Sequence, residues 1–165
     1  MLNKNESIEN VRQENLDEFP KEFGSEYLDS GFAHDVMRIH DIQIDFISKT
    51  ITAKLDLTET HQNQYTNQES NEFHLSAVTG YRYIAQLIIL YICRDLNIKK
   101  QDLGEVYEIS HEMQTKSKIS TPENISATVN FSKYIKRESK LVAEVDFNIE
   151  EAFSGKFRLL TFLDK

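Results

Sequence analysis

The chain has 165 residues, of which 39% are hydrophobic and 28% are charged, as expected for one globular domain with a single core. Its net charge of −8 argues against nucleic-acid binding, which requires a basic surface. The longest uninterrupted apolar run, residues 87–93, is far shorter than the roughly 20 residues that cross a bilayer. With no secretory signal in the sequence, we expect a cytoplasmic protein without a membrane span.

The acidic charge is concentrated in the first 35 residues, which contain nine Asp and Glu residues but three Lys and Arg residues. Ile8, Val11 and Leu16 have the spacing of a weak amphipathic helix that would end at Pro20, although the segment has few other apolar residues. We expect residues 1–35 to form a partly ordered acidic arm, and residues 36–165 to form the folded domain.

Apolar and polar residues alternate in the next two segments, 36–47 and 50–58, which predicts a pair of β-strands. Ser48 and Lys49 stand between them and suit a tight hairpin. The polar segment 59–72 has no apolar periodicity and is predicted to be a loop.

Residues 74–96, HLSAVTGYRYIAQLIILYICRDL, form an apolar stretch of helical length. Its apolar side chains would point in nearly every direction around the helix axis, so the helix must be surrounded by protein. Cys93 is the single cysteine, which excludes an intrachain disulfide, and we expect it to be an inert packing residue within this helix.

Four further alternating segments follow: 105–117, 125–135, 141–149 and 152–162. The polar links between them are short, so these strands should be antiparallel neighbours. In the first of them His111 falls between Ile109 and Met113 on one face, which predicts a satisfied core histidine.

The order strand, strand, long helix, four strands predicts an α+β hot-dog fold, in which one curved antiparallel sheet wraps around one central helix. The alternative is a helix lying on an open sheet, but that helix should have one clearly polar face. A single hot-dog unit leaves an edge strand uncovered, so we expect a homodimer or a dimer of dimers.

The first turn of the buried helix carries amide groups without helical partners and a partial positive charge, which can polarise a thioester carbonyl. Ser76 is the candidate N-cap, with Thr79 three residues later. Gly80 indicates either the close approach of a substrate or tight packing of helix and sheet. We expect these three residues to contribute to substrate binding.

Thr79, Arg82, Tyr83 and Gln86 share one face of this helix. Buried polar groups need partners, so the face is either a site or a set of structural hydrogen bonds. We expect Tyr83 and Gln86 to be catalytic, with Arg82 and Leu87 binding substrate or, for Arg82, forming a salt bridge.

Polar residues just before the helix could complete such a site. Glu72 or His74 could orient an attacking water, and Tyr65 in the preceding loop could donate its hydroxyl. The alternative for Glu72 and Tyr65 is an ordinary exposed or packed loop side chain.

The segment HLSAVTGYRYIAQLIILY (74–91) resembles the central-helix motif of the FcoT-like long-chain acyl thioesterases, which are hot-dog proteins. The matching positions are His74, Ser76, Ala77 and Gln86. The resemblance implies a hydrolase acting on acyl-CoA or acyl-carrier-protein thioesters, and some relatives add groups to unsaturated acyl chains instead. The family has an Asn before the Gln, where this chain has Ala85, which counts against full activity if that Asn is catalytic.

Hot-dog dehydratases are a second comparison, but they pair a His with an acid, and no acidic residue occurs between His74 and Asp95. We therefore expect an acyl thioesterase, with a non-catalytic module for acyl binding or dimerisation as the alternative, and addition or dehydration on an enoyl or hydroxyacyl thioester as a further one.

No glycine loop for phosphate and no spacing for zinc ligands occurs, so no cofactor or metal is expected. Carrier phosphates could meet four basic residues, or these could be solvated strand ends: Lys133, Lys136, Arg137 and Lys140.

Overall fold

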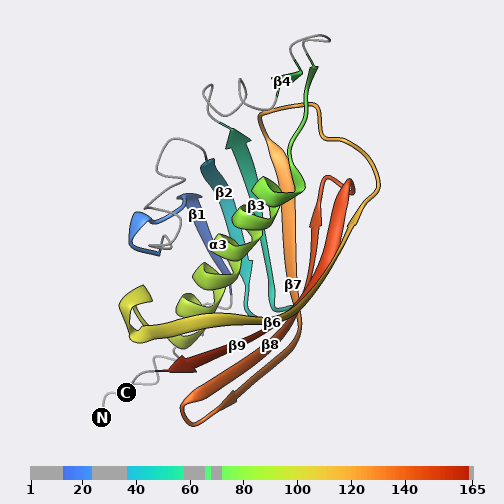
Figure 1. Cartoon of the computed structure of the whole chain (residues 1–165). Coiled ribbons are helices and arrows are strands. Elements are labelled where there is room, and N and C mark those ends of the chain that lie inside the picture. Colours follow the sequence, from blue (N-terminus) through green and yellow to red (C-terminus); the bar gives the residue numbers. More distant parts are fainter. Residues whose placement is uncertain (1–12, 24–36, 58–65, 68–71, 164–165) are drawn as a thin grey trace, which may run out of the picture.

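The computed structural model describes residues 13–23, 37–57, 66–67 and 72–163, and within them an antiparallel sheet curves around one long helix (Figure 1). The sheet has the spatial order β1-β2-β3-β7-β8-β9-β6. Its strands are β1 (Gln13–Glu18), β2 (Met37–Asp45), β3 (Thr50–Leu57), β6 (Leu103–Thr115), β7 (Ile125–Arg137), β8 (Lys140–Ile149) and β9 (Phe153–Leu163). The small elements are β4 (Thr66–Asn67) paired with β5 (Glu72–Phe73), and the 3-10 helices η1 (Lys21–Phe23) and η2 (Lys100–Asp102).

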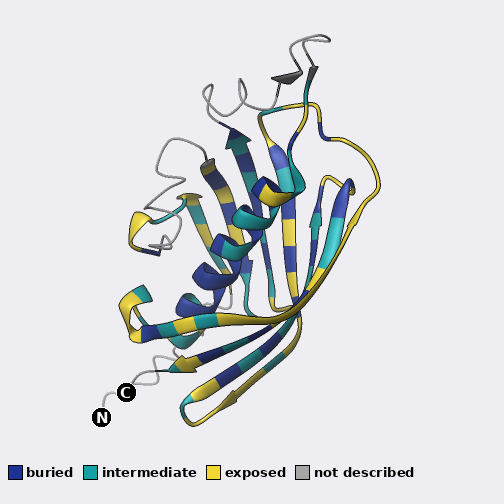
Figure 2. Cartoon of the chain, viewed as in Figure 1, coloured by how far each residue is buried: buried dark blue, intermediate teal, exposed yellow. Residues whose placement is uncertain are grey.

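The predicted alternation of apolar and polar residues determines which side of the sheet meets the helix. In β3 and β8 every second residue is buried, starting from Ile51 and from Leu141. Figure 2 shows this alternation along the strands, with the buried positions continuing onto the helix. The inward residues of the sheet and the helix therefore share one apolar core.

The central helix α3 (Ala77–Leu96) begins and ends where local chemistry predicts. Ser76 is the N-cap, and its hydroxyl accepts a hydrogen bond from the Thr79 amide at 3.1 Å. Asn97 ends the helix in the left-handed conformation, with φ of 51°. The helix crosses the concave side of the sheet, and two strands before it and four long strands after it follow the predicted chain order, so the hot-dog fold is confirmed (Figure 1). The four strands after the helix are antiparallel as predicted, but β6 pairs with β9 and not with β7, which pairs with β3 instead. No helix in the described part of the chain is long and apolar enough to cross a membrane.

The sheet extends further toward the N-terminus than the sequence predicts. Residues 13–18, which we had assigned to the arm, form β1 and pair with β2 from Gln13 opposite Asp45 to Glu18 opposite His40. The amphipathic helix proposed through Leu16 is therefore wrong for residues 13–18, because Leu16 packs half-buried as a strand residue at the edge of the core. Ile8 and Val11 lie outside the described residues.

The opposite edge of the sheet is β6, and almost all of it is exposed (Figure 2). Its pairing with β9 shifts register twice, between Leu103 and Val106 and between Glu108 and Ser110. The predicted core position of His111 is wrong, because its side chain is 54% exposed. The physical reason is the position of the strand at the edge of the sheet: residues 107–115 are all exposed, including the apolar Ile109 and Met113.

Candidate functional site

The beginning of α3 is held by hydrogen bonds within the chain. The Thr79 amide is engaged by the Ser76 hydroxyl, which also lies 2.9 Å from the Thr79 hydroxyl. A Cβ on Gly80 would lie 2.9 Å from Cδ1 of Ile149, so this glycine allows tight packing of the helix on β8. The contact supports the packing interpretation of Gly80.

Tyr83 and Leu87, two of the predicted site residues, point into the closed part of the core. Both are fully buried, and the Tyr83 hydroxyl donates a hydrogen bond to the backbone carbonyl of Asp56, at 2.9 Å. Burial raises the pKa of Tyr83 far above its ordinary value, so the hydroxyl keeps its proton. The hydrogen bond of this hydroxyl links the helix to β3.

Gln86 and Arg82 lie on the side of α3 between this closed face and the open one. Gln86 is 5% exposed, and its Oε1 atom is buried without a hydrogen-bond partner in the described structure. Arg82 is half-buried. An acceptor buried without a donor is uncommon, so Gln86 remains a candidate for contact with a ligand.

The residues predicted just before the helix are less well placed or less well described. His74 is exposed, one residue before the buried Leu75. Glu72 belongs to β5, and Tyr65 lies outside the described residues. The structure thus places His74 on the surface near the start of α3, whereas Tyr83 lies in the closed core.

One strip of α3 faces away from the closed core, toward the edge strand β6. Val78, Tyr81 and Ala85 follow one another at helical spacing along it and are exposed or half-buried. Tyr81 packs edge-to-face on Phe157 of β9, with ring centroids 5.0 Å apart. This strip is where a ligand could reach the helix.

A cluster of polar side chains lies against this strip, and the sequence analysis did not predict it. The Tyr81 hydroxyl donates a hydrogen bond to Oε2 of Glu108, and Oε1 of Glu108 is hydrogen-bonded to Nδ1 of His111. The Glu108 and His111 side chains are 27% and 54% exposed. Glu108 and His111 are three residues apart, so in a regular strand they would point to opposite faces. The bulge between Glu108 and Ser110 brings them to the same face.

The cluster has the chemistry of an oriented base. A carboxylate only accepts hydrogen bonds, so the proton of the neutral His111 ring must be on Nδ1. The Nε2 atom is then left with its lone pair and can take a proton from water or a substrate. Burial and the bond to Glu108 raise the pKa of Tyr81 well above its ordinary value, so Tyr81 holds the carboxylate as a donor.

An apolar pocket of about 110 Å³ begins at this cluster. Tyr81 and Glu108 of the cluster line it together with Ala85, Ile88, Ile89, Val106, Phe157 and Leu159. Such a pocket can hold a short apolar segment of a ligand next to the reacting group.

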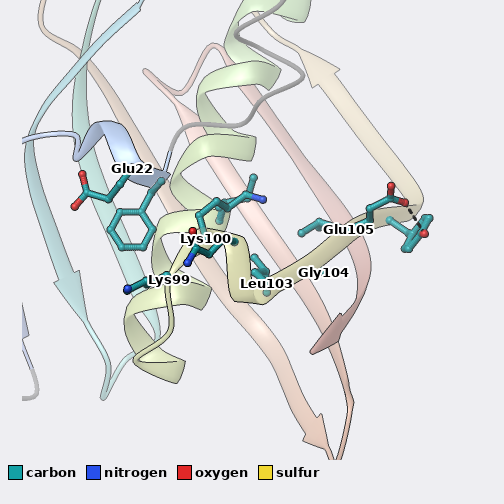
Figure 3. A pocket seen from close by; sticks show the side chains of 11 residues that line it. Glu22, Lys99, Lys100, Leu103, Gly104 and Glu105 are labelled. Atoms are coloured by element: carbon teal, nitrogen blue, oxygen red, sulfur yellow. Dashed lines mark hydrogen bonds between the residues drawn. The ribbon is translucent and has the colours of Figure 1, made fainter. Parts of the chain in front are cut away.

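A larger cavity, of about 890 Å³, continues along the start of β6. Figure 3 shows Lys99 and Lys100 between Glu22 at one end and Glu105 at the other. Glu105 accepts a hydrogen bond from the Tyr107 hydroxyl at 2.6 Å. No group of three His, Cys, Asp or Glu side chains in the described ranges is arranged to hold a metal ion.

Comparison with known proteins supports the fold and goes no further. No protein-family model and no curated protein matches the chain. Among solved structures, a hot-dog-like protein from Thermanaerovibrio acidaminovorans has a TM-score of 0.50 at 8% identity, covering 70% of this chain and 82% of that one. At that identity the likeness shows the hot-dog fold alone.

Two further solved structures have lower TM-scores. A mutant thioesterase from Pseudomonas aeruginosa has 0.47 at 8% identity, covering 77% of this chain and 81% of its own. A hypothetical thioesterase with coenzyme A from Streptococcus pneumoniae has 0.40 at 10% identity, covering 80% and 83%. The resemblance of the central helix to the FcoT-like thioesterases stays a prediction.

Proposed function

We propose that the protein is an acyl-thioester enzyme that hydrolyses an acyl-CoA or acyl-carrier-protein thioester, with His111 as the general base. The observation that carries this proposal is the Glu108 carboxylate, which is held by both Tyr81 and His111 at the mouth of an apolar pocket. An imidazole oriented by a carboxylate is the arrangement that activates water or hydroxyl nucleophiles in many hydrolases.

The proposed reaction needs one water and no other reactant. Nε2 of His111 takes a proton from the water as its oxygen attacks the thioester carbonyl, and Glu108 stabilises the imidazolium that forms. When the tetrahedral intermediate collapses, the carbon–sulfur bond breaks and the proton passes from His111 to the departing thiolate. The positive end of α3 lies one turn before Tyr81 and favours the negative charge on the carbonyl oxygen.

The residues predicted from the sequence keep specific roles in this proposal. The unpartnered Oε1 of Gln86 would accept a hydrogen bond from the substrate. Arg82 and Ser76 would contact the substrate near the start of the helix. His74, which is exposed, is the competing candidate for the general base.

We further propose a homodimer that forms through the open edge of β6. The strand leaves its outer edge unpaired in the described structure, and Tyr107 and Ile109 on it are 48% and 52% exposed. Pairing two β6 strands would cover these side chains and place the partner subunit beside the cluster. The buried free thiol of Cys93 is consistent with a reducing cytoplasm.

The test compares two histidines. Purified protein is incubated with acyl-CoA esters of several chain lengths, and free thiol is measured for the wild type, His111→Ala and His74→Ala. We expect His111→Ala to lower kcat by about 10²–10⁴-fold and His74→Ala to leave it nearly unchanged. The reverse order would assign the base to His74.

Product analysis distinguishes the alternative activities. Release of free thiol supports hydrolysis, whereas a hydroxyacyl or enoyl thioester of altered mass would indicate addition or dehydration. Acyl-CoA binding without any turnover would identify a non-catalytic module. Light scattering at micromolar concentration tests the dimer, and a monomer mass would contradict it.

A further inference from the structure

The apolar pocket at Glu108 and the large cavity at the start of β6 adjoin each other, and together they are called the groove. Ile89 of α3 and Val106 of β6 line both of them. A linear ligand whose reacting group lies at Glu108 and His111 can therefore run along β6 toward Leu103. The groove continues there into the larger cavity between η1, η2 and β6.

The far end of this groove contains two adjacent positive charges. Lys99 is exposed and Lys100 is half-buried. Neither makes an ion pair within the part of the chain that the structure describes. Of the two carboxylates in the cavity, Glu105 is bonded to Tyr107, and Glu22 lies on the side of the lysines, away from Glu105, but forms no ion pair with either lysine in the described structure (Figure 3). The middle of the cavity is thus a place where an anion would find two unpaired cations.

We propose that Lys99 and Lys100 bind a phosphate of the thiol carrier whose acyl thioester reacts at His111. This inference rests on the proposed function, and it names the substrate class: a thioester on a phosphate-bearing carrier rather than on a simple thiol. Lysine ammonium groups beside an open cavity suit phosphate oxygens.

The length of the groove agrees with such a carrier. Leu103 and Glu108 are five strand residues apart, which corresponds to about 16 Å at roughly 3.3 Å per residue. In a phosphopantetheine arm, the chain of bonds from the sulfur to the phosphorus is about as long as the backbone of four to five peptide residues. When it is extended, it therefore spans about 15 Å. A phosphate on a thioester bound at Glu108 can therefore reach the Leu103 end of the groove, where Lys99 and Lys100 line the same cavity as Leu103.

The structure favours these lysines over the basic residues of the β7–β8 hairpin. Lys133 forms an ion pair with Glu144 at 3.3 Å, and Lys140 lies over the ring of Phe162 at 5.5 Å. None of the four hairpin residues lines the groove within the described structure.

The experiment measures KM for three thioesters of the same acyl group. They are the coenzyme A ester, the carrier-protein ester and the pantetheine ester, which has no phosphate. The test variant is Lys99→Gln/Lys100→Gln. The control is Lys49→Gln/Lys116→Gln, which makes the same charge change at exposed positions outside the groove. Calorimetric titration with coenzyme A gives a Kd that does not depend on turnover.

We expect the test variant to raise KM for the coenzyme A ester, the carrier-protein ester or both by about ten-fold, and to leave the pantetheine ester unchanged. Which phosphate ester responds identifies the carrier. The control should match the wild type. An equal effect on the pantetheine ester, or an unchanged Kd for coenzyme A, would overturn the inference. Lysine-dependent binding of coenzyme A without hydrolysis of any ester would support the phosphate site and count against the proposed function instead.

Discussion

Two tyrosines that are two residues apart on α3 should respond in opposite ways to the loss of the hydroxyl group. Tyr83→Phe removes a hydroxyl that is fully buried and bonded to the carbonyl of Asp56 on β3. Tyr81→Phe removes a hydroxyl that is bonded to Glu108 at the open side of the helix. The chemical change is the same, so the environment alone decides the effect.

The magnitudes follow from burial. The loss of the Tyr83 bond leaves a buried acceptor with one partner fewer, at about 1–3 kcal/mol. For a domain of this size each kcal/mol corresponds to about 2–4 °C, so Tm should fall by about 2–12 °C. The Tyr81 bond is closer to solvent and should contribute about 1 kcal/mol or less. Its loss frees the carboxylate that positions His111, however, and misplacement of a catalytic group by about 1 Å can lower kcat by about 10²-fold.

Thermal unfolding and thioester cleavage measured on both variants decide between the roles. We expect Tyr83→Phe to lower Tm and to keep kcat, and Tyr81→Phe to keep Tm and to lower kcat. As a positioning residue, Tyr81 should also shift the pH profile of kcat. A loss of turnover in Tyr83→Phe at unchanged Tm would refute this reasoning and restore the catalytic role that the helix pattern first predicted for Tyr83.

Three further predictions concern the arm, the bulge and alkaline pH. A chain lacking residues 1–20 should remain a folded dimer with cooperative unfolding, but its Tm should fall because the edge of β2 loses β1; an unchanged Tm would show that β1 contributes nothing. Deletion of Ile109, which is 52% exposed, should keep the fold by circular dichroism but lower kcat as strongly as His111→Ala, since the bulge disappears. Burial raises the pKa of Cys93 to about 11. The folded state therefore holds the thiol proton more tightly than the unfolded state does, so stability should be lost as pH rises from about 9 toward 11. In Cys93→Ala the fall in Tm should begin at a higher pH, at about 10, where tyrosines ionise in the unfolded state but stay protonated in the folded one.

The main elements of the fold could be predicted because each is encoded locally. The period of two in β3 and β8 and the Ser76 cap depend on neighbouring residues, and the structure confirms them. β1 could not be predicted in this way. Its residues are mostly polar, and it is a strand because β2 offers it an edge, which is a tertiary effect that no local pattern contains.

The surroundings of the polar face of α3 could not be predicted from the sequence. Helical spacing places Tyr83 and Gln86 on one face, yet it does not say whether that face meets β3 or solvent. The open strip could not be recognised from the sequence. Tyr81 and Ala85 are four residues apart and lie on one face of the helix, but nothing marks this face as part of a site. The partner of Tyr81, Glu108, lies in a strand whose orientation depends on a bulge.

That bulge links the chemistry of the site to the edge of the sheet. One extra residue, Ile109, is inserted between Glu108 and Ser110, and it turns two side chains of the same strand toward α3. Such an insertion is tolerated most easily in a strand at the edge of its own subunit, because no second strand of the described chain pairs with it there. β6 is the edge strand that follows α3 in the chain and lies against its open strip. The place where the hot-dog sheet can accept a bulge without losing its core is therefore also the place where an oriented histidine can meet a groove along the helix.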